Sequence, residues 1–281
     1  MCPNKDLERE DKGYMDLSLY KKIIDESQDF IFDVNLAHRG ESLLHPEVVE
    51  MIGCAKKRNV FTRLHTNGSL LTEEMSYRII HAGLDRLSFS FDGYDKETYE
   101  KIRKQGDFNK TIANIVHFLE TKKALNKKRP VTAIEVIAFG NTISKESKGT
   151  REEFLKHFRN LPLNNLVFKE LHNWAGEIEK KDKSGKYLLC PFPWNALVVY
   201  WDGSVLPCTQ DFFGYYVLGN AKDSSLKEIW NNEKMANLRK MLITREIDEL
   251  DTCSNCDRLR RKGFLGIPRE YLWKFIAKRM P

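Results

Sequence analysis

The sequence predicts an α/β protein, in which a parallel sheet is covered by helices and is followed by a smaller C-terminal domain of a different type. Three observations predict this. Strand-like and helix-like segments alternate through the first two-thirds of the chain, the pattern of repeated strand–helix units. Polar clusters follow the strands at regular places. After a lysine-rich stretch at residues 176–186, the pattern changes to a hairpin and a group of cysteines.

The strand–helix units can be followed in chain order. An apolar run at residues 30–36 is followed by an amphipathic segment with one apolar helical face. Further along, Thr72 with two acids after it is typical of a helix N-terminus. The predicted strands are 30–36, 59–65, 86–91, 131–139 and 165–171. The predicted helices between and after them are 46–58, 72–82, 96–103, 109–122 and 150–158.

The C-terminal third differs from these units. Residues 196–200 and 204–207 flank Asp202-Gly203, which is typical of a β-hairpin, and a helix is expected at 225–243. Residues 268–280 are amphipathic and basic, a pattern that suits either packing on the protein's own barrel or docking at a membrane surface. We therefore expect a barrel over 1–176, a second domain over 187–262 and a basic tail over 263–281.

Composition narrows the class of protein. The chain has 281 residues, enough for one large domain with a small appendage. Its longest uninterrupted apolar stretch, residues 196–201, is far shorter than the roughly 20 residues that span a bilayer. Because the N-terminus has no apolar signal-peptide region, we expect a cytoplasmic protein, whose six cysteines bind metal or act in catalysis.

The positive charge is local. The chain carries a formal charge of +6, and residues 257–281 contain eight basic side chains and two acids, so the rest of the chain is neutral. A neutral body argues against a broad nucleic-acid-binding face.

Four cysteines lie late in the chain. Cys190 and Cys208 flank the predicted hairpin, and Cys253 and Cys256 form a C-x-x-C pair whose two thiolates can share one metal centre. Four thiolates suit a tetrahedral zinc ion or an iron–sulfur cluster, and the spacing alone leaves both open. Cys54 lies in the helix 46–58, where we expect a small buried hydrophobic side chain.

These cysteines occur within a longer pattern, C-x12-G-x4-C followed by C-x2-C. The pattern is accompanied by Pro193-Trp194, Leu218-Gly219-Asn220 and the sequence Glu-Ile-Trp-Asn at 228–231. It resembles the SPASM/twitch auxiliary-cluster domain of radical S-adenosylmethionine (radical SAM) enzymes. Because no cysteine follows Cys256, the resemblance is to the shorter twitch form, with one auxiliary iron–sulfur cluster, expected to be [4Fe–4S].

The front half resembles the same family, which implies a partial (β/α)6 barrel, here without its first strand. Arg39-Gly40-Glu41 is similar to the family's Gly-Gly-Glu segment, so Gly40 and Glu41 are expected to hold the amino group of S-adenosylmethionine (SAM). The other positions that the resemblance implies for SAM binding are Thr66, Asn67, Ser88, Ser90 and Asp92. Arg103 suits either the SAM carboxylate or a solvated helix surface.

The family's radical-generating [4Fe–4S] cluster requires a C-x3-C-x2-C motif, and this chain has one cysteine there, Cys2. We interpret Cys2 as the last ligand of the motif, with two cysteines encoded upstream, and expect the chain as given to be inactive. The alternative is a true start with an inactive barrel. The resemblance also implies a flavodoxin- or ferredoxin-type reductant as partner.

Substrate-facing residues are expected at the carboxyl ends of the strands, where parallel barrels place their chemistry. Glu135 is expected to point inward if its apolar neighbours point outward, with Lys169 and His172 near it as catalytic groups. The resemblance implies a 5′-deoxyadenosyl radical that abstracts hydrogen, and we favour net oxidation of a sugar- or cyclitol-like molecule. The alternatives are a peptide- or protein-modifying maturase, or a non-catalytic four-cysteine metal-binding protein.

Overall fold

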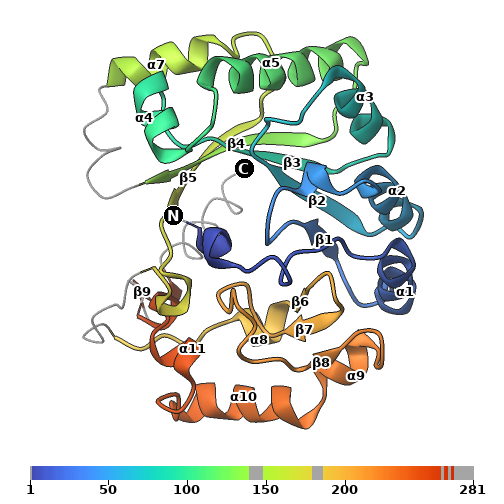
Figure 1. Cartoon of the computed structure of the whole chain (residues 1–281), viewed down its shortest axis with the longest axis vertical. Helices are drawn as coiled ribbons and strands as arrows, with labels where there is room; N and C mark the ends of the chain where they lie inside the picture. The colour runs from blue at the N-terminus through green and yellow to red at the C-terminus, as the bar shows by residue number, and fades with distance from the viewer. Residues whose placement is uncertain (1, 139–147, 179–185, 261–262, 265–266, 269–281) are drawn as a thin grey trace. The chain divides into compact units, whose positions relative to one another are not determined.

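The computed structural model describes residues 2–138, 148–178, 186–260, 263–264 and 267–268. The chain forms two compact units, drawn in Figure 1. One contains residues 20–171, and the other contains 1–19 together with 172–281. The first nineteen residues and residues 172–176 thus group with the C-terminal unit, whereas the sequence-based division assigned them to the barrel.

The barrel unit contains a five-stranded sheet in which every neighbouring pair is parallel and the strand order follows the chain. All five predicted strands are confirmed: β1 Asp33–Leu36, β2 Phe61–Thr66, β3 Arg86–Ser90, β4 Val131–Ala138 and β5 Asn165–Glu170. The helices are α1 Leu17–Ser27, α2 Val48–Lys57, α3 Glu73–His81, α4 Lys96–Ile102, α5 Phe108–Ala124 and α7 Lys148–Lys156, with the 3-10 turn η2 at Ser42–Leu44. The helices α2, α3 and α5 cover one face of the sheet (Figure 1).

The two faces of the sheet differ in character because side chains alternate along each strand. On the helix-covered face, Leu64, Leu87 and Ile134 belong to one hydrophobic core. On the opposite face, the register aligns His65 with Ser88, and Ser90 with Glu135. The expectation that Glu135 points away from its apolar neighbours is therefore confirmed, and this second face is the polar interior of the partial barrel.

Glycines turn the chain at the carboxyl ends of three successive strands. Gly40, Gly68 and Gly93 follow β1, β2 and β3, with φ values of +79°, +77° and +113°. A side chain is disfavoured at these φ values, and at Gly93 a Cβ would also lie 2.8 Å from the backbone nitrogen of Tyr99. The same edge of the sheet therefore carries three tight turns.

The opposite edge of the sheet is fastened by Asp85, which is buried just before β3. Its carboxylate accepts hydrogen bonds from the Thr62 backbone N–H (3.0 Å) and from Lys56 Nζ (3.0 Å), and it also pairs with Arg129. Burial raises the pKa of this carboxyl group, but these three donors outweigh burial and hold the pKa below its ordinary value. Asp85 thus joins the start of β3 to β2 and to α2.

We expect Asp85→Asn to lower the thermal unfolding midpoint by about 5 °C, corresponding to about 2 kcal/mol, because two cations lose their buried partner. In the wild-type protein, this contribution is present above pH 4 and is lost as the pH falls through the lowered pKa of Asp85. Differential scanning fluorimetry at several pH values measures both effects, with the exposed Asp29→Asn as control. Equal midpoints for Asp85→Asn and the wild type at pH 7 would contradict the assignment.

The C-terminal unit is built around a small antiparallel sheet, β6 Val198–Val199, β7 Ser204–Leu206 and β8 Gly219–Asn220. The predicted hairpin is confirmed as β6–β7, with Gly203 at φ +92° in its turn. The remaining elements are η1 Pro3–Asp6, η3 Trp174–Gly176, α8 Phe192–Asn195, α9 Leu226–Trp230, α10 Glu233–Thr244, α11 Asp251–Ser254, η4 Asp257–Leu259, β9 Gly263–Phe264 and β10 Ile267–Pro268.

The single helix predicted over 225–243 is wrong in one respect, because it is divided between α9 and α10. The first helix ends at Trp230 with Asn231 as its C-cap, and Asn232 caps the second, its side chain accepting from the Met235 N–H at 2.9 Å. Residues 269–281, most of the expected tail, lie outside the described residues. In the described part of the chain, no helix is long and apolar enough to span a membrane.

Candidate functional site

The loops after β1 and β2 are joined by Glu41. One carboxylate oxygen accepts from the Leu43 N–H (3.1 Å), and the other accepts from the Asn67 N–H (2.8 Å). A carboxylate offers about four acceptor positions, so Glu41 has capacity left for an ammonium group. The structure therefore brings together Gly40, Glu41 and Asn67, three of the residues expected at SAM.

The segment after β3 is fixed by Asp92, which is fully buried. Its carboxylate accepts from the Ile137 N–H (2.9 Å) and from Arg103 Nη2 (2.7 Å). The Arg103 side chain is largely buried. Of the two roles considered for Arg103, the solvated helix charge is excluded, and its guanidinium is held at the β3 end of the sheet by Asp92.

The remaining residues expected at SAM lie at different depths. Ser90 is half-buried and is paired with Glu135 in the sheet. Ser88 precedes it by two residues on the same face of β3, farther from the carboxyl edge, and is fully buried. Thr66 aligns with Phe89 on the helix-covered face, and its hydroxyl accepts from the Gly68 N–H at 3.0 Å. Thr66 therefore shapes the turn, while Ser90 is the serine nearer the carboxyl edge.

A three-residue ion cluster lies on the polar interior face. Glu135, 7% exposed, accepts a hydrogen bond from Lys169 on β5, and its carboxylate lies 3.3 Å from Nδ1 of His65 on β2. Burial raises the pKa of Glu135, but the His65 hydrogen bond and the charges of His65 and Lys169 outweigh it and lower the pKa to about 2. Glu135 is therefore ionised at neutral pH and is a weak base.

The three predicted catalytic residues are divided between the two compact units. Glu135 and Lys169 are brought together, whereas His172 belongs to the other compact unit, where its Nε2 contacts Arg258 and its Nδ1 lies 3.8 Å from Asp257. Sequence reasoning missed His65 and Asp257. Side chains alternate between the two faces along β2, and Leu64 faces the core, so its neighbour His65 lies on the interior face. This alternation is a signal in the sequence that could have identified His65.

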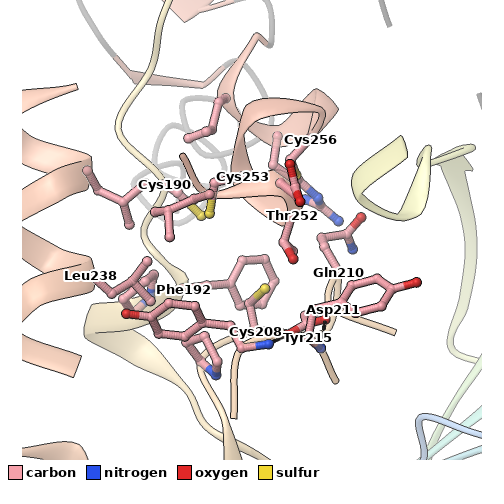
Figure 2. A pocket seen from close by; sticks show the side chains of 18 of the residues that line it. Cys190, Phe192, Cys208, Gln210, Asp211, Tyr215, Leu238, Thr252, Cys253 and Cys256 are labelled. Atoms are coloured by element: carbon pink, nitrogen blue, oxygen red, sulfur yellow. Dashed lines mark hydrogen bonds between the residues drawn. The ribbon is translucent and has the colours of Figure 1, made fainter. Parts of the chain in front are cut away.

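The four late cysteines line one cavity of about 270 Å³ in the C-terminal unit (Figure 2). Cys190 lies just before α8, and Cys208 lies two residues after the end of β7. Cys253 lies in α11, and Cys256 directly precedes η4. Burial raises the pKa of the Cys208 thiol to about 12, and burial with the neighbouring cysteines also raises the pKa values of Cys253 and Cys256. Without a cation these thiols stay protonated.

Several features fit an iron–sulfur cluster. Backbone N–H groups of Gln210 and Asp211 donate to the Cys208 sulfur, and that of Arg258 donates to the Cys256 sulfur, which favours the thiolate form that a cluster binds. Among the described residues, no three ligating side chains are close enough for a single metal ion, although four thiols line the cavity.

Two polar residues, Gln210 and Asp211, line the cavity together with the cysteines. Asp211 is buried and accepts backbone N–H bonds from Gly214, Tyr215 and Tyr216, which folds the loop after Cys208 (Figure 2). Gln210, 4% exposed, lines the same cavity, and its Oε1 has no hydrogen-bond partner among the described residues. A buried polar atom of this kind is expected where a bound group completes the site.

Cys2 precedes the turn η1 and is half-buried. It is the one cysteine ahead of β1, and a cluster with three thiolate ligands needs two more. The residues of this chain therefore do not by themselves complete a radical-generating cluster, in contrast to the four-cysteine site.

Comparison with known proteins agrees with this architecture. The Radical SAM superfamily model matches residues 1–127, and SPASM, an iron–sulfur cluster-binding domain, matches residues 190–257. The tungsten-containing aldehyde ferredoxin oxidoreductase cofactor-modifying protein of Pyrococcus furiosus is 26% identical, over 83% of this chain and 77% of that protein. The S-adenosyl-L-methionine-dependent 2-deoxy-scyllo-inosamine dehydrogenase of Niallia circulans is 25% identical, over 92% of this chain and 86% of that protein.

Solved structures share the fold. BtrN in complex with AdoMet and 2-DOIA is similar with a TM-score of 0.59 and 22% identity, covering 91% of this chain and 85% of that one. Native anSMEcpe with bound AdoMet has a TM-score of 0.58 and 17% identity, covering 96% and 89%.

The parallel sheet, the turns at its carboxyl edge and the four-cysteine cavity define a partial α/β barrel protein with a second, cysteine-lined domain. The chain belongs to the radical SAM superfamily and carries a C-terminal SPASM domain. These two domains imply [4Fe–4S] clusters and SAM as cofactors.

Proposed function

We propose that this protein oxidises a small polar substrate, of the sugar or cyclitol class, by two electrons. The observation that carries the proposal is the cavity lined by four cysteines of the chain itself. A cluster with four protein ligands has no open iron for a substrate atom, so it is suited to accept an electron. When bound with a reduced [4Fe–4S] cluster, SAM supplies the 5′-deoxyadenosyl radical that removes a hydrogen atom.

The chain's own residues have distinct roles in this proposal. Glu41, with acceptor capacity left after binding two backbone N–H groups, receives the SAM ammonium group. Ser90, at the carboxyl end of β3, and Arg103, oriented by Asp92, lie at the same edge for the ribose or carboxylate. Thr66 and Ser88 act indirectly, by shaping the turn and the interior face.

Glu135 and Lys169 are proposed to hold substrate hydroxyl groups. With its pKa near 2, Glu135 accepts hydrogen bonds and does not take a proton at neutral pH. The side chain of Lys169 is 44% exposed, and its ammonium group has further N–H donors besides the one that Glu135 accepts. These donors can bind a substrate oxygen. We assign His172 to the surroundings of the auxiliary cluster, because its ring contacts Arg258 two residues after Cys256.

The relative from Niallia circulans supports this substrate class, because its name describes the SAM-dependent dehydrogenation of a cyclitol, over most of both chains. A peptide-modifying maturase is the second candidate, supported by the structure of SuiB bound to its precursor peptide, which shares the fold with a TM-score of 0.52. We also propose a cytoplasmic location and a flavodoxin- or ferredoxin-type reductant.

The test uses a form of the protein in which Cys2 ends a complete C-x3-C-x2-C motif, incubated anaerobically with SAM, reductant and candidate sugars, cyclitols and peptides. Oxidation predicts one 5′-deoxyadenosine per product and a product lighter by two hydrogens, measured by mass spectrometry. Regeneration of SAM after turnover, or a product of unchanged mass, would show that the reaction class is wrong. Absence of SAM cleavage would favour a non-catalytic metal-binding protein.

A further inference from the structure

The turn after β5 makes an unusual contact with the C-x-x-C segment. The Asn173 side chain uses both ends of its amide: Nδ2 donates to the Asn255 carbonyl oxygen (2.8 Å), and Oδ1 accepts from the Asp257 N–H (3.1 Å). These two backbone groups belong to the peptide bonds on either side of Cys256. One side chain therefore holds the backbone of Cys256 from both directions.

The contact is reciprocal and buried. The Asp257 carboxylate accepts a hydrogen bond from the Asn173 N–H at 3.2 Å. The side chain of each residue therefore accepts a hydrogen bond from the backbone of the other. Asn173, Asp257 and Cys256 are 8%, 6% and 8% exposed. Little water competes for these hydrogen bonds, which favours one backbone conformation at Cys256.

The turn that presents Asn173 is conformationally costly. Trp174, Ala175 and Gly176 have successive positive φ values of 50°, 58° and 101°, and a left-handed conformation is unfavourable for a residue that carries a side chain. Such a conformation persists where surrounding contacts fix it, and often at functional sites. At Gly176, a Cβ would lie 2.8 Å from the Cβ of Asn255, so the turn approaches the C-x-x-C segment closely.

The same turn also contacts the segment that follows Cys208. Trp174 packs edge-on against Phe212, with ring centroids 5.2 Å apart. Phe212 directly follows Asp211, the residue that folds the loop after Cys208. The turn thus touches the chain next to two of the four cysteines that line the cavity, although it supplies no cysteine.

We propose that Asn173 is a positioning residue for the auxiliary cluster: it orients Cys256 for ligation by bracketing its two peptide bonds. Residues outside the ligand set that orient ligands commonly change metal affinity by about 10- to 100-fold when they are replaced. The proposal concerns cluster binding and is independent of the substrate.

The test uses the chain as it stands, because all four late cysteines are within it. After anaerobic reconstitution, we expect Asn173→Ala and the near-isosteric Asn173→Asp to lose iron to a ferrous chelator about ten-fold faster than the wild type. Asn173→Asp keeps an acceptor for the Asp257 N–H, but it loses the donor to Asn255 and places a second carboxylate beside Asp257. Asn237→Ala, an exposed asparagine on α10, is the matched control.

A second readout separates positioning from general damage. If Cys256 alone is loosened, the iron that it binds leaves first, so mild oxidation should give a larger [3Fe–4S] EPR signal in both Asn173 variants than in the control. Should Asn173→Ala fail to fold, Asn173→Asp decides by the same two measurements. Wild-type rates of iron loss in Asn173→Asp, or loss of the whole cluster without a three-iron stage, would overturn the proposal.

Discussion

Replacing Cys253 by alanine is expected to abolish binding of the auxiliary cluster. The thiol lies in the buried cavity with Cys190, Cys208 and Cys256, and its pKa is raised by burial first and by the neighbouring cysteines second. Removing one of four ligands leaves an iron open to solvent and chelation. We expect anaerobically reconstituted Cys253→Ala to lose the charge-transfer absorption and nearly all of its iron.

Cys54→Ala provides the control for this experiment. Cys54 is also buried, but it lies in α2 of the barrel unit and is not one of the residues that line the cavity. It is expected to keep the iron content and the spectrum of the wild type. Stoichiometric zinc without iron in the anaerobically prepared wild-type protein would contradict the cluster assignment and support a structural zinc site.

Replacing Glu135 by glutamine is expected to lower kcat by about 100-fold in the form with a complete radical-generating motif, without changing its iron content. The substitution keeps the size of the side chain but removes the anion that holds His65 and Lys169. Those two groups then lose their common partner, and the substrate loses an oriented lysine. Glu73→Gln, an exposed glutamate on α3, is the control.

The pH dependence gives an independent check on Glu135. Its pKa is lowered from 4.5 to about 2, so its ion pairs stabilise the folded state above pH 4.5 and are lost as the pH falls toward 2. A shift of that size corresponds to roughly 3 kcal/mol. Wild-type and Glu135→Gln stabilities should therefore converge at low pH. If the wild-type rate changed with pH between 5 and 8 and this change disappeared in Glu135→Gln, the conclusion that Glu135 is ionised at neutral pH would be wrong.

Local patterns were sufficient for much of the architecture. The five strands, most of the helices and the β6–β7 hairpin follow from periodicity and turn residues, which are properties of neighbouring positions. The single helix expected at 225–243 failed because Asn232 caps a new helix there, and its competing local hydrogen bond outweighed the apolar spacing.

The sequence also indicated the chemistry of the four-cysteine site, since the spacing of Cys190, Cys208, Cys253 and Cys256 is itself a ligand pattern. The spacing alone left zinc and an iron–sulfur cluster open, because both use thiolates, and the family resemblance of the flanking motifs favoured the cluster. The shared cavity, the backbone N–H groups at two sulfurs and the Oε1 atom of Gln210, which has no hydrogen-bond partner among the described residues, favour the cluster. The cavity itself depends on segments that are distant in the chain.

The sequence by itself determined which residue types stand at the carboxyl ends of the strands and which thiols are available. The tertiary structure alone decided their partners: His65 and Lys169 for Glu135, Asp92 for Arg103, and the peptide bonds around Cys256 for Asn173. The physical reason is that partners are set by strand register and by contacts between segments up to 84 residues apart. The spacing of neighbouring residues determines neither the strand register nor the contacts between distant segments.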